Sequence, residues 1–182
     1  HPHAPIAIGS DSLGYDAAGN LLSGQGRSFV WDGENRPIRI AGDGTTVALV
    51  YGPDGSRLQK RVEREHGACA GTRTDITLTL GPDIERETRW TCQAGSWAAS
   101  ETLTKYPHAD VRRVGTGAAA ARYQLHRDHL GSVRLVTDAS GAVADSYGFR
   151  PYGSRSRFNQ LAGTPLEAKG FIGERHDPET GL

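Results

Sequence analysis

One short pattern recurs along this 182-residue chain and restricts its fold more than composition does. Each copy has an aromatic residue, then Asp or Gly, then a Gly- or Asn-containing turn, then a branched or Leu-rich run. The first copies read LGYDAAGNLLSG, FVWDGENRPIRIAGDG and LVYGPDGSRLQKRVE. Turn-forming residues between alternating or apolar runs are typical of β-hairpins. The sequence therefore predicts an all-β fold of repeated antiparallel hairpins, each burying one face only against its neighbours.

The same pattern returns in HRDHLGSVRLVTDASGAVADSYGFRPYG (126–153), which reads as strands around two turns. Glycine adopts the positive φ that tight turns need, and we expect turns at Gly19, Gly33, Gly55, Gly131 and Gly141. Aromatic residues at repeat positions are expected to stack on their counterparts one unit along and so to fix strand register. These residues are Tyr15, Trp31, Tyr51, Tyr147 and Tyr152. The tail, 169–182, is expected to add one more strand, and no convincing helix pattern is present.

Two cysteines, Cys69 and Cys92, lie in a segment (64–104) that breaks the repeat, and we interpret this segment as an inserted hairpin. Alternating residues on both sides of the Gly-Pro-Asp at 81–83 predict two paired strands. The cysteines would then face each other across the open end of the hairpin. This geometry permits a disulfide, and a disulfide would indicate an oxidising compartment. The alternative is that the two cysteines are unrelated thiols in an inserted loop.

Charge and hydropathy argue against several partners. Lys and Arg together number 21 and so do Asp and Glu, so no overall field attracts nucleic acid or an anionic membrane. Nowhere are there the roughly 18 consecutive apolar residues that a membrane-spanning helix needs. The chain starts at His1 and contains no Met, so we expect it to be a piece of a longer product whose targeting segment lies elsewhere.

Residues that suggest chemistry are better interpreted as structural. His126 and His129 are three apart, so on a strand they face opposite sides and cannot easily share a metal. Asp128 and Asp138 sit where a turn begins, and there a carboxylate accepts backbone N–H bonds. The same interpretation extends to Asp145, Asp177 and Glu179, against a role in glycoside hydrolysis. Ser132 lacks the second glycine of a nucleophile elbow. We expect no catalytic, metal-binding or cofactor-binding residue.

The motifs YDAAGNL, WDGENRPIRI and YGPDGSRLQKR resemble the tyrosine–aspartate (YD) repeats of Rhs proteins. The order DHLGSVRLVTD, PYG and then DPETGL resembles the Rhs-repeat-associated core that closes such repeats. On this resemblance, residues 1–63 are YD-type repeats, 64–104 the inserted hairpin, and 105–182 the core, ending before the family's cleavage segment. Because that segment is absent from the chain, no catalytic residue is carried over.

The resemblance implies part of a spiral YD/Rhs β-shell, as in toxin-complex C components and teneurin-type shells. Such a shell encapsulates a C-terminal toxin or effector until delivery by type VI secretion or a related route, in bacterial competition. The implied partners are the remainder of the shell, the enclosed toxin, and secretion-system or immunity proteins. The implied location is outside the bacterial cell or on its surface.

Two other functions stay open at this stage. The chain could be an extracellular module that binds glycans or a partner protein through exposed aromatic residues such as Trp31 or Trp97. Alternatively, it could belong to a self-cleaving polymorphic toxin whose protease residues lie downstream. Glycan binding that is lost on mutation of the tryptophans would favour the first, and a downstream Asp-Pro cleavage segment would favour the second.

Overall fold

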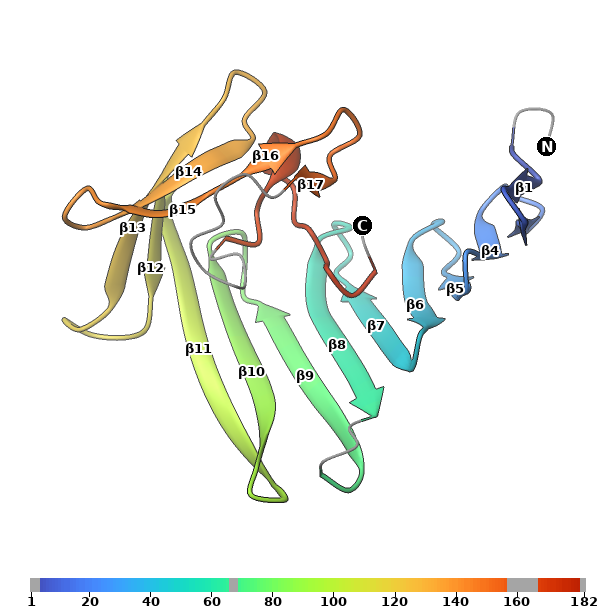
Figure 1. Ribbon diagram of the computed structural model, residues 1–182, viewed down its shortest axis with the longest axis horizontal. Coiled ribbons are helices and arrows are strands. Elements are labelled where there is room, and N and C mark those ends of the chain that lie inside the picture. Colours follow the sequence, from blue (N-terminus) through green and yellow to red (C-terminus); the bar gives the residue numbers. More distant parts are fainter. Residues whose placement is uncertain (1–3, 66–68, 157–166, 181–182) are drawn as a thin grey trace. The chain divides into compact units, whose positions relative to one another are not determined.

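The chain forms an all-β structure built on one large antiparallel sheet (Figure 1). The computed structural model describes residues 4–65, 69–156 and 167–180. Thirteen strands follow one another across the sheet in chain order, so each strand except β3 and β15 at the edges pairs with the strand before it and the strand after it. They are β3 (Gly14–Tyr15), β4 (Leu21–Gly24), β5 (Arg27–Trp31), β6 (Pro37–Gly42), β7 (Thr45–Tyr51), β8 (Arg57–Glu65), β9 (Thr72–Thr79), β10 (Ile84–Gln93), β11 (Ser96–His108), β12 (Val111–Val114), β13 (Ala121–Arg127), β14 (Val133–Asp138) and β15 (Val143–Ser146).

Short elements lie at the two ends of the chain. Two further two-stranded sheets are formed by β1 (Ala7–Ile8) with β2 (Asp11–Ser12) and by β16 (Gly148–Phe149) with β17 (Arg155–Ser156). The tail is not the strand that the sequence predicted. It contains a single 3-10 turn, η1 (Phe171–Gly173), and one isolated bridge between Lys169 and Arg175, because Gly170 and Gly173 fold the segment back on itself.

The chain divides into two compact units. Unit 1 contains residues 1–79 and 87–101, and unit 2 contains residues 80–86 and 102–182. The hairpin predicted around residues 81–83 is present as β9 and β10. It is not set apart from the repeats, since both strands belong to the main sheet between β8 and β11. The segment 64–104 therefore contributes β9, β10 and parts of β8 and β11 to the main sheet, and the order of the strands is not interrupted.

The core of unit 1 is a row of apolar side chains that runs across three strands. In the strand register, Ile40 of β6 lies opposite Val47 of β7, and Val47 lies opposite Val62 of β8. All three side chains are almost completely buried, and Leu49, two residues after Val47, lies on the same face. Because side chains alternate between faces along a strand, this row follows directly from the period-two pattern of the sequence.

The core of unit 2 combines aliphatic residues of β13 and β14 with two tyrosines. Leu125, Val133 and Val136 form its buried centre, together with Tyr106 and Tyr147. Tyr123, Ala144 and Phe149 pack around this cluster and are partly buried. Since buried tyrosine hydroxyls need hydrogen-bond partners, this core also requires polar groups near its centre.

Candidate functional site

One five-residue turn recurs in both units. In each copy the first residue donates its N–H to the carbonyl of the fifth, and the fourth donates its N–H to the carbonyl of the first. The fourth residue has a positive φ. Among the described residues this pattern occurs at 16–20, 32–36, 52–56, 128–132, 138–142, 150–154 and 170–174. It is the local structure behind the repeated motif of the sequence.

Four of the five glycines named from the sequence occupy the fourth position of this turn. Gly19, Gly55, Gly131 and Gly141 have φ values between 79° and 93°. Gly33 does not have this role. It is the second residue of its turn, and the positive φ of 61° belongs to Asn35. Asn tolerates the left-handed region better than most residues with a side chain, so the turn forms without glycine at that position.

Aspartate side chains hold these turns closed. The Asp128 carboxylate accepts hydrogen bonds from the N–H groups of Leu130 (3.0 Å) and Ser132 (2.9 Å). Asp138 accepts from Ser140 and Ala142 in the same way. The Ser140 hydroxyl and backbone N–H bonds hold the pKa of Asp138 below its usual value, outweighing partial burial. The turn interpretation of these two carboxylates therefore matches the geometry.

A second kind of turn connects the other ends of the strands in unit 1. Two residues with positive φ join β4 to β5, β6 to β7 and β10 to β11. They are Gln25–Gly26, Asp43–Gly44 and Ala94–Gly95. These turns were not among those expected above. Their signal in the sequence is a Gly after one polar or small residue between two strand-like runs, which is typical of a two-residue hairpin turn.

The repeat aromatics of unit 1 reach the preceding strand through hydrogen bonds. Trp31 on β5 donates its indole N–H to the Leu21 carbonyl on β4 at 2.8 Å. Tyr51 on β7 donates its hydroxyl to the Pro37 carbonyl on β6 at 3.0 Å. Tyr15 likewise donates to the Pro5 carbonyl. These bonds connect each aromatic residue to the backbone of an earlier segment, a contact that the stacking hypothesis had not included.

The last two residues predicted to fix register behave differently from each other. Tyr147 is buried and donates its hydroxyl to Asp145. Tyr152 is completely exposed at the third position of the 150–154 turn. A side chain at the tip of a turn has no neighbouring strand beside it, so Tyr152 is not placed to fix strand register. The ladder interpretation is wrong for this residue.

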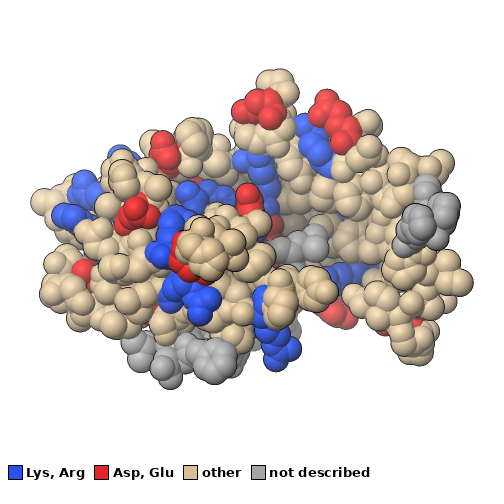
Figure 2. Space-filling view, turned by 90° about the horizontal axis from the view of Figure 1, so that it is seen from above, with Lys and Arg blue, Asp and Glu red and all other residues tan. Residues whose placement is uncertain are grey.

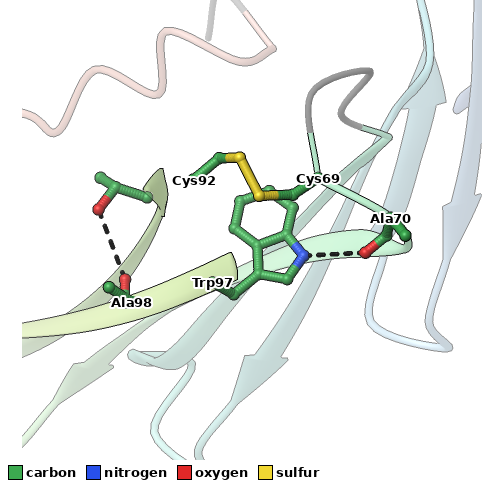
Figure 3. The surroundings of a disulfide bond; sticks show 6 residues. Cys69, Ala70, Cys92, Trp97 and Ala98 are labelled. Carbon is green, nitrogen blue, oxygen red and sulfur yellow. Dashed lines mark hydrogen bonds between the residues drawn. A yellow bond between two sulfur atoms is a disulfide. The ribbon is translucent and has the colours of Figure 1, made fainter. Parts of the chain in front are cut away.

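Cys69 and Cys92 form a disulfide in unit 1, with a Cα–Cα distance of 5.8 Å (Figure 3). It connects the residues before β9 to the end of β10, which is the open end of the predicted hairpin. Trp97, at the start of β11, points its indole N–H at the Ala70 carbonyl, 3.1 Å away. The disulfide and this hydrogen bond together fasten the β8–β9 connection to the β10–β11 hairpin.

A buried carboxylate, Glu167, lies at the centre of unit 2 with no exposed surface. Its Oε1 accepts a hydrogen bond from the Tyr106 hydroxyl at 2.9 Å and another from the Lys169 N–H at 2.8 Å. Its Oε2 lies 3.6 Å from Nε of Arg112. A buried charge is stable only when it is paired and hydrogen-bonded. Tyr106 and Arg112 provide this pairing from β11 and β12, far away in the sequence.

The backbone next to Glu167 is held as well. Its N–H donates to the Tyr147 hydroxyl at 2.9 Å, and that hydroxyl in turn donates to buried Asp145. Arg155 donates to the Glu167 carbonyl at 2.7 Å. Asp145 thus lies within β15 as part of a buried network, and the prediction that it begins a turn was wrong.

Burial and charge shift the pKa values of this network. Desolvation raises the pKa of the Tyr106 hydroxyl well above its usual range, and the Glu167 charge adds to the effect. Desolvation also raises the pKa of Tyr147, with its hydrogen bond to Asp145 as the next cause. The pKa of Lys169 is lowered, mainly by burial. The tyrosines therefore stay protonated and act as hydrogen-bond donors to the carboxylates.

Other residues that suggested chemistry have local structural partners. Nε2 of His126 lies 3.0 Å from the Thr137 hydroxyl, across the β13–β14 pair. His129 is exposed in the 128–132 turn. The Ser132 hydroxyl accepts a hydrogen bond from the N–H of Ile172 at 2.9 Å. The Asp177 carbonyl accepts a hydrogen bond from the N–H of Thr180, in a turn of the tail.

Comparison with known proteins gives a fold but no family. No family model matches the chain, and no curated protein matches it in sequence. Among solved structures, a chain of the TcdB2–TccC3 crystal structure matches with a TM-score of 0.72 and 19% identity. A Photorhabdus luminescens Tc holotoxin pore with a mutation in TccC3 matches with a TM-score of 0.71, also at 19% identity.

Both matches cover 92% of this chain but less than a tenth of the matched chain, 9% and 8% respectively. At this identity the likeness concerns the fold alone, and function must be argued from the residues. The resemblance that the sequence motifs indicated therefore has a structural counterpart in toxin-complex proteins.

Proposed function

We propose that this chain is part of the wall of an Rhs-type β-shell, a container that encloses a C-terminal toxin or effector. The observation that carries the proposal is the sheet itself. Thirteen consecutive strands form a simple antiparallel order, and the arrangement matches chains of toxin-complex structures. The YD-type motifs, which lie at the five-residue turns, support the same family.

The mechanism of such a wall is steric. Each strand satisfies its backbone groups against two neighbours, so an opening for an enclosed chain requires the loss of a whole row of hydrogen bonds. In unit 1 the two kinds of turn alternate and connect strands of increasing length from β4 to β8. This design can be repeated to any width, since each hairpin adds the same local contacts.

We propose no enzymatic activity for these residues. Asp128 and Asp138 are engaged by the N–H groups of their own turns. Asp145 and Glu167 are buried completely and bonded to tyrosine hydroxyls, so a substrate has no access to them. Any self-cleavage of a longer product would depend on residues outside this chain.

The proposed partners are the rest of the shell and its enclosed segment, with a secretion apparatus or an immunity protein acting on the whole. The proposed location is the bacterial surface or the medium, and the disulfide suits an oxidising compartment. None of the described helical segments is long and apolar enough to cross a membrane.

The test is protection of an enclosed segment in the full-length gene product. Limited trypsin digestion with mass spectrometry should find a protected stretch that lies outside these 182 residues. Replacing Gly55 and Gly131 together with Val should disrupt two turns and make that stretch cleavable. Gly33→Ala is the matched control, because a Cβ at Gly33 meets no atom within 4 Å. A product with no protected stretch, or one whose protection survives the double substitution, would rule out the wall function.

A further inference from the structure

The third position of the five-residue turn distinguishes three turns of unit 2 from the others. In the remaining turns this position holds a small or polar residue: Ala18, Glu34, Asp54 or Ser140. In three turns of unit 2 it holds a large apolar residue. These residues, called the apolar tips below, are Leu130 (54% exposed), Tyr152 (100%) and Ile172 (51%).

The three turns that carry the apolar tips are packed together. The Ile172 N–H donates to the Ser132 hydroxyl, which joins the 170–174 turn to the 128–132 turn. A Cβ added to Gly153 would lie 2.8 Å from Cδ1 of Phe171, so the 150–154 turn touches the third turn as well. Phe149, the residue before the 150–154 turn, and Phe171, in the 170–174 turn, form a ring pair with 5.8 Å between centroids. The 128–132 and 150–154 turns both point to the top of Figure 1.

Ile172 occupies a backbone conformation that opposes its side chain. Its φ is 48° and its ψ 21°, and it precedes Gly173 in a turn closed by the Glu174 N–H and the Phe171 carbonyl. A β-branched residue is a strained choice there, whereas Asn, Asp or Gly fits. The two-residue turns of unit 1 have Gln25, Asp43 and Ala94 at the equivalent position. Half-exposed Ile172 gains little from internal packing, so strain at this position points to a contact outside the chain.

The chain has no net charge overall, but basic residues flank the apolar tips locally. Arg150 begins the turn of Tyr152, is exposed, and pairs with none of the described carboxylates. Arg134 is about half exposed and lies 3.7 Å from Asp128. No acidic residue occurs between Asp145 and Glu167, although Glu174 is exposed beside Ile172. In the left half of Figure 2, Lys and Arg atoms lie among uncharged atoms, with several Asp and Glu atoms between them.

We propose that Leu130, Tyr152 and Ile172 insert into the interface of an anionic lipid bilayer, with Arg150 and Arg134 on the phosphate groups. Each tip presents one side chain at the end of a turn, a shape that a fluid interface accepts without a matching pocket. Tyr is favoured at the boundary between headgroups and hydrocarbon, and Arg pairs with phosphate through a fork of N–H groups. The inference does not rest on the shell function.

The experiment is co-sedimentation of the complete chain with vesicles of phosphatidylcholine, with and without phosphatidylserine. The wild-type chain should bind the mixed vesicles, more weakly as salt is raised. Substituting Leu130, Tyr152 and Ile172 together with Ser should reduce binding by about tenfold or more, because three apolar insertions are lost. A matched control replaces Leu22, Val30 and Val50, exposed apolar residues of unit 1, with Ser and should leave binding unchanged.

Ile172→Asn separates binding from folding. Asn suits the positive φ, so this variant should have a higher thermal midpoint than the wild type and still bind vesicles several-fold more weakly. Absence of vesicle binding by the wild-type chain, or equal binding by the triple variant, would overturn the proposal. A contact of the tips with another protein would produce the first of these results.

Discussion

Units 1 and 2 use the same turn but stabilise their strands in different ways. In unit 1 a row from Ile40 through Val47 to Val62 crosses neighbouring strands in register, so contacts join segments that are close in sequence. In unit 2, Glu167 accepts a hydrogen bond from Tyr106, 61 residues earlier in the chain. The first arrangement can be extended by adding hairpins, whereas the second depends on one returning segment. Substitutions should therefore have local effects in unit 1 and wider effects in unit 2.

The largest effect should come from Glu167→Ala. The substitution leaves the Tyr106 hydroxyl and the Arg112 guanidinium without their buried partner, which should destabilise unit 2 by about 3–5 kcal/mol. Urea unfolding would measure the loss, and hydrogen exchange would show faster exchange in β13 and β14 than in β6 and β7. Glu174→Ala, at an exposed position, is the control. Equal loss in the two variants would show that the buried network is unimportant.

Removal of the disulfide should have the next largest effect, and it should appear in unit 1. Cys69 and Cys92 are 23 residues apart, and a cross-link that closes a loop of this size stabilises a fold by about 3 kcal/mol. The Cys69→Ser and Cys92→Ser double variant should lose about this amount in urea unfolding under oxidising conditions. Dithiothreitol should lower the stability of the wild type to that of the variant. A variant as stable as the oxidised wild type would contradict this expectation.

Turn glycines should have smaller effects that are similar in the two units. Gly55→Val and Gly131→Val place a β-branched residue at φ values of 79° and 82°, which should cost about 2 kcal/mol each. Gly33→Ala, without a positive φ, should change stability by no more than about 0.5 kcal/mol. Thermal melts of the three variants test this order. Unchanged melting of Gly131→Val would contradict the role of that turn.

The smallest effect should be a loss of stability in acid. The Ser56 hydroxyl and backbone N–H lower the pKa of Asp54 below 3.8, its value in an unstructured chain. Folding is therefore stabilised above pH 3.8, and the contribution is lost as the pH falls through the lower pKa of the folded state. NMR titration of the Asp54 carboxyl should show the depressed pKa, and Ser56→Ala should move it back towards 3.8. A titration that does not respond to Ser56→Ala would exclude this cause.

The sequence predicts the local parts of the structure well. The turn at Gly131, the hairpin around residues 81–83 and the strands on both sides of Asp138 each depend on residues within a few positions, so their patterns are legible. Gly33 lies in the turn expected of it, but the residue with positive φ is Asn35, two positions later. Asn tolerates that conformation, so a positive φ in a turn does not always fall on glycine.

The long-range parts could not be predicted in the same way. Nothing in the sequence around Glu167 shows that Tyr106 and Arg112 come to meet it, since that contact depends on the return of the tail. Tyr152 does not hold the motif position of Tyr15, Trp31 and Tyr51, which stand directly before their turns; Phe149 holds that position in the 150–154 turn. Only the place of Tyr152 at the tip of a turn, which the fold decides, makes it exposed.

The most direct test of the central claim is a cryo-EM map of the full-length gene product. The wall function predicts that strands β4 to β15 form part of one continuous sheet surrounding density that belongs to another part of the chain. A map in which both faces of this sheet meet solvent, with no enclosed density, would contradict it.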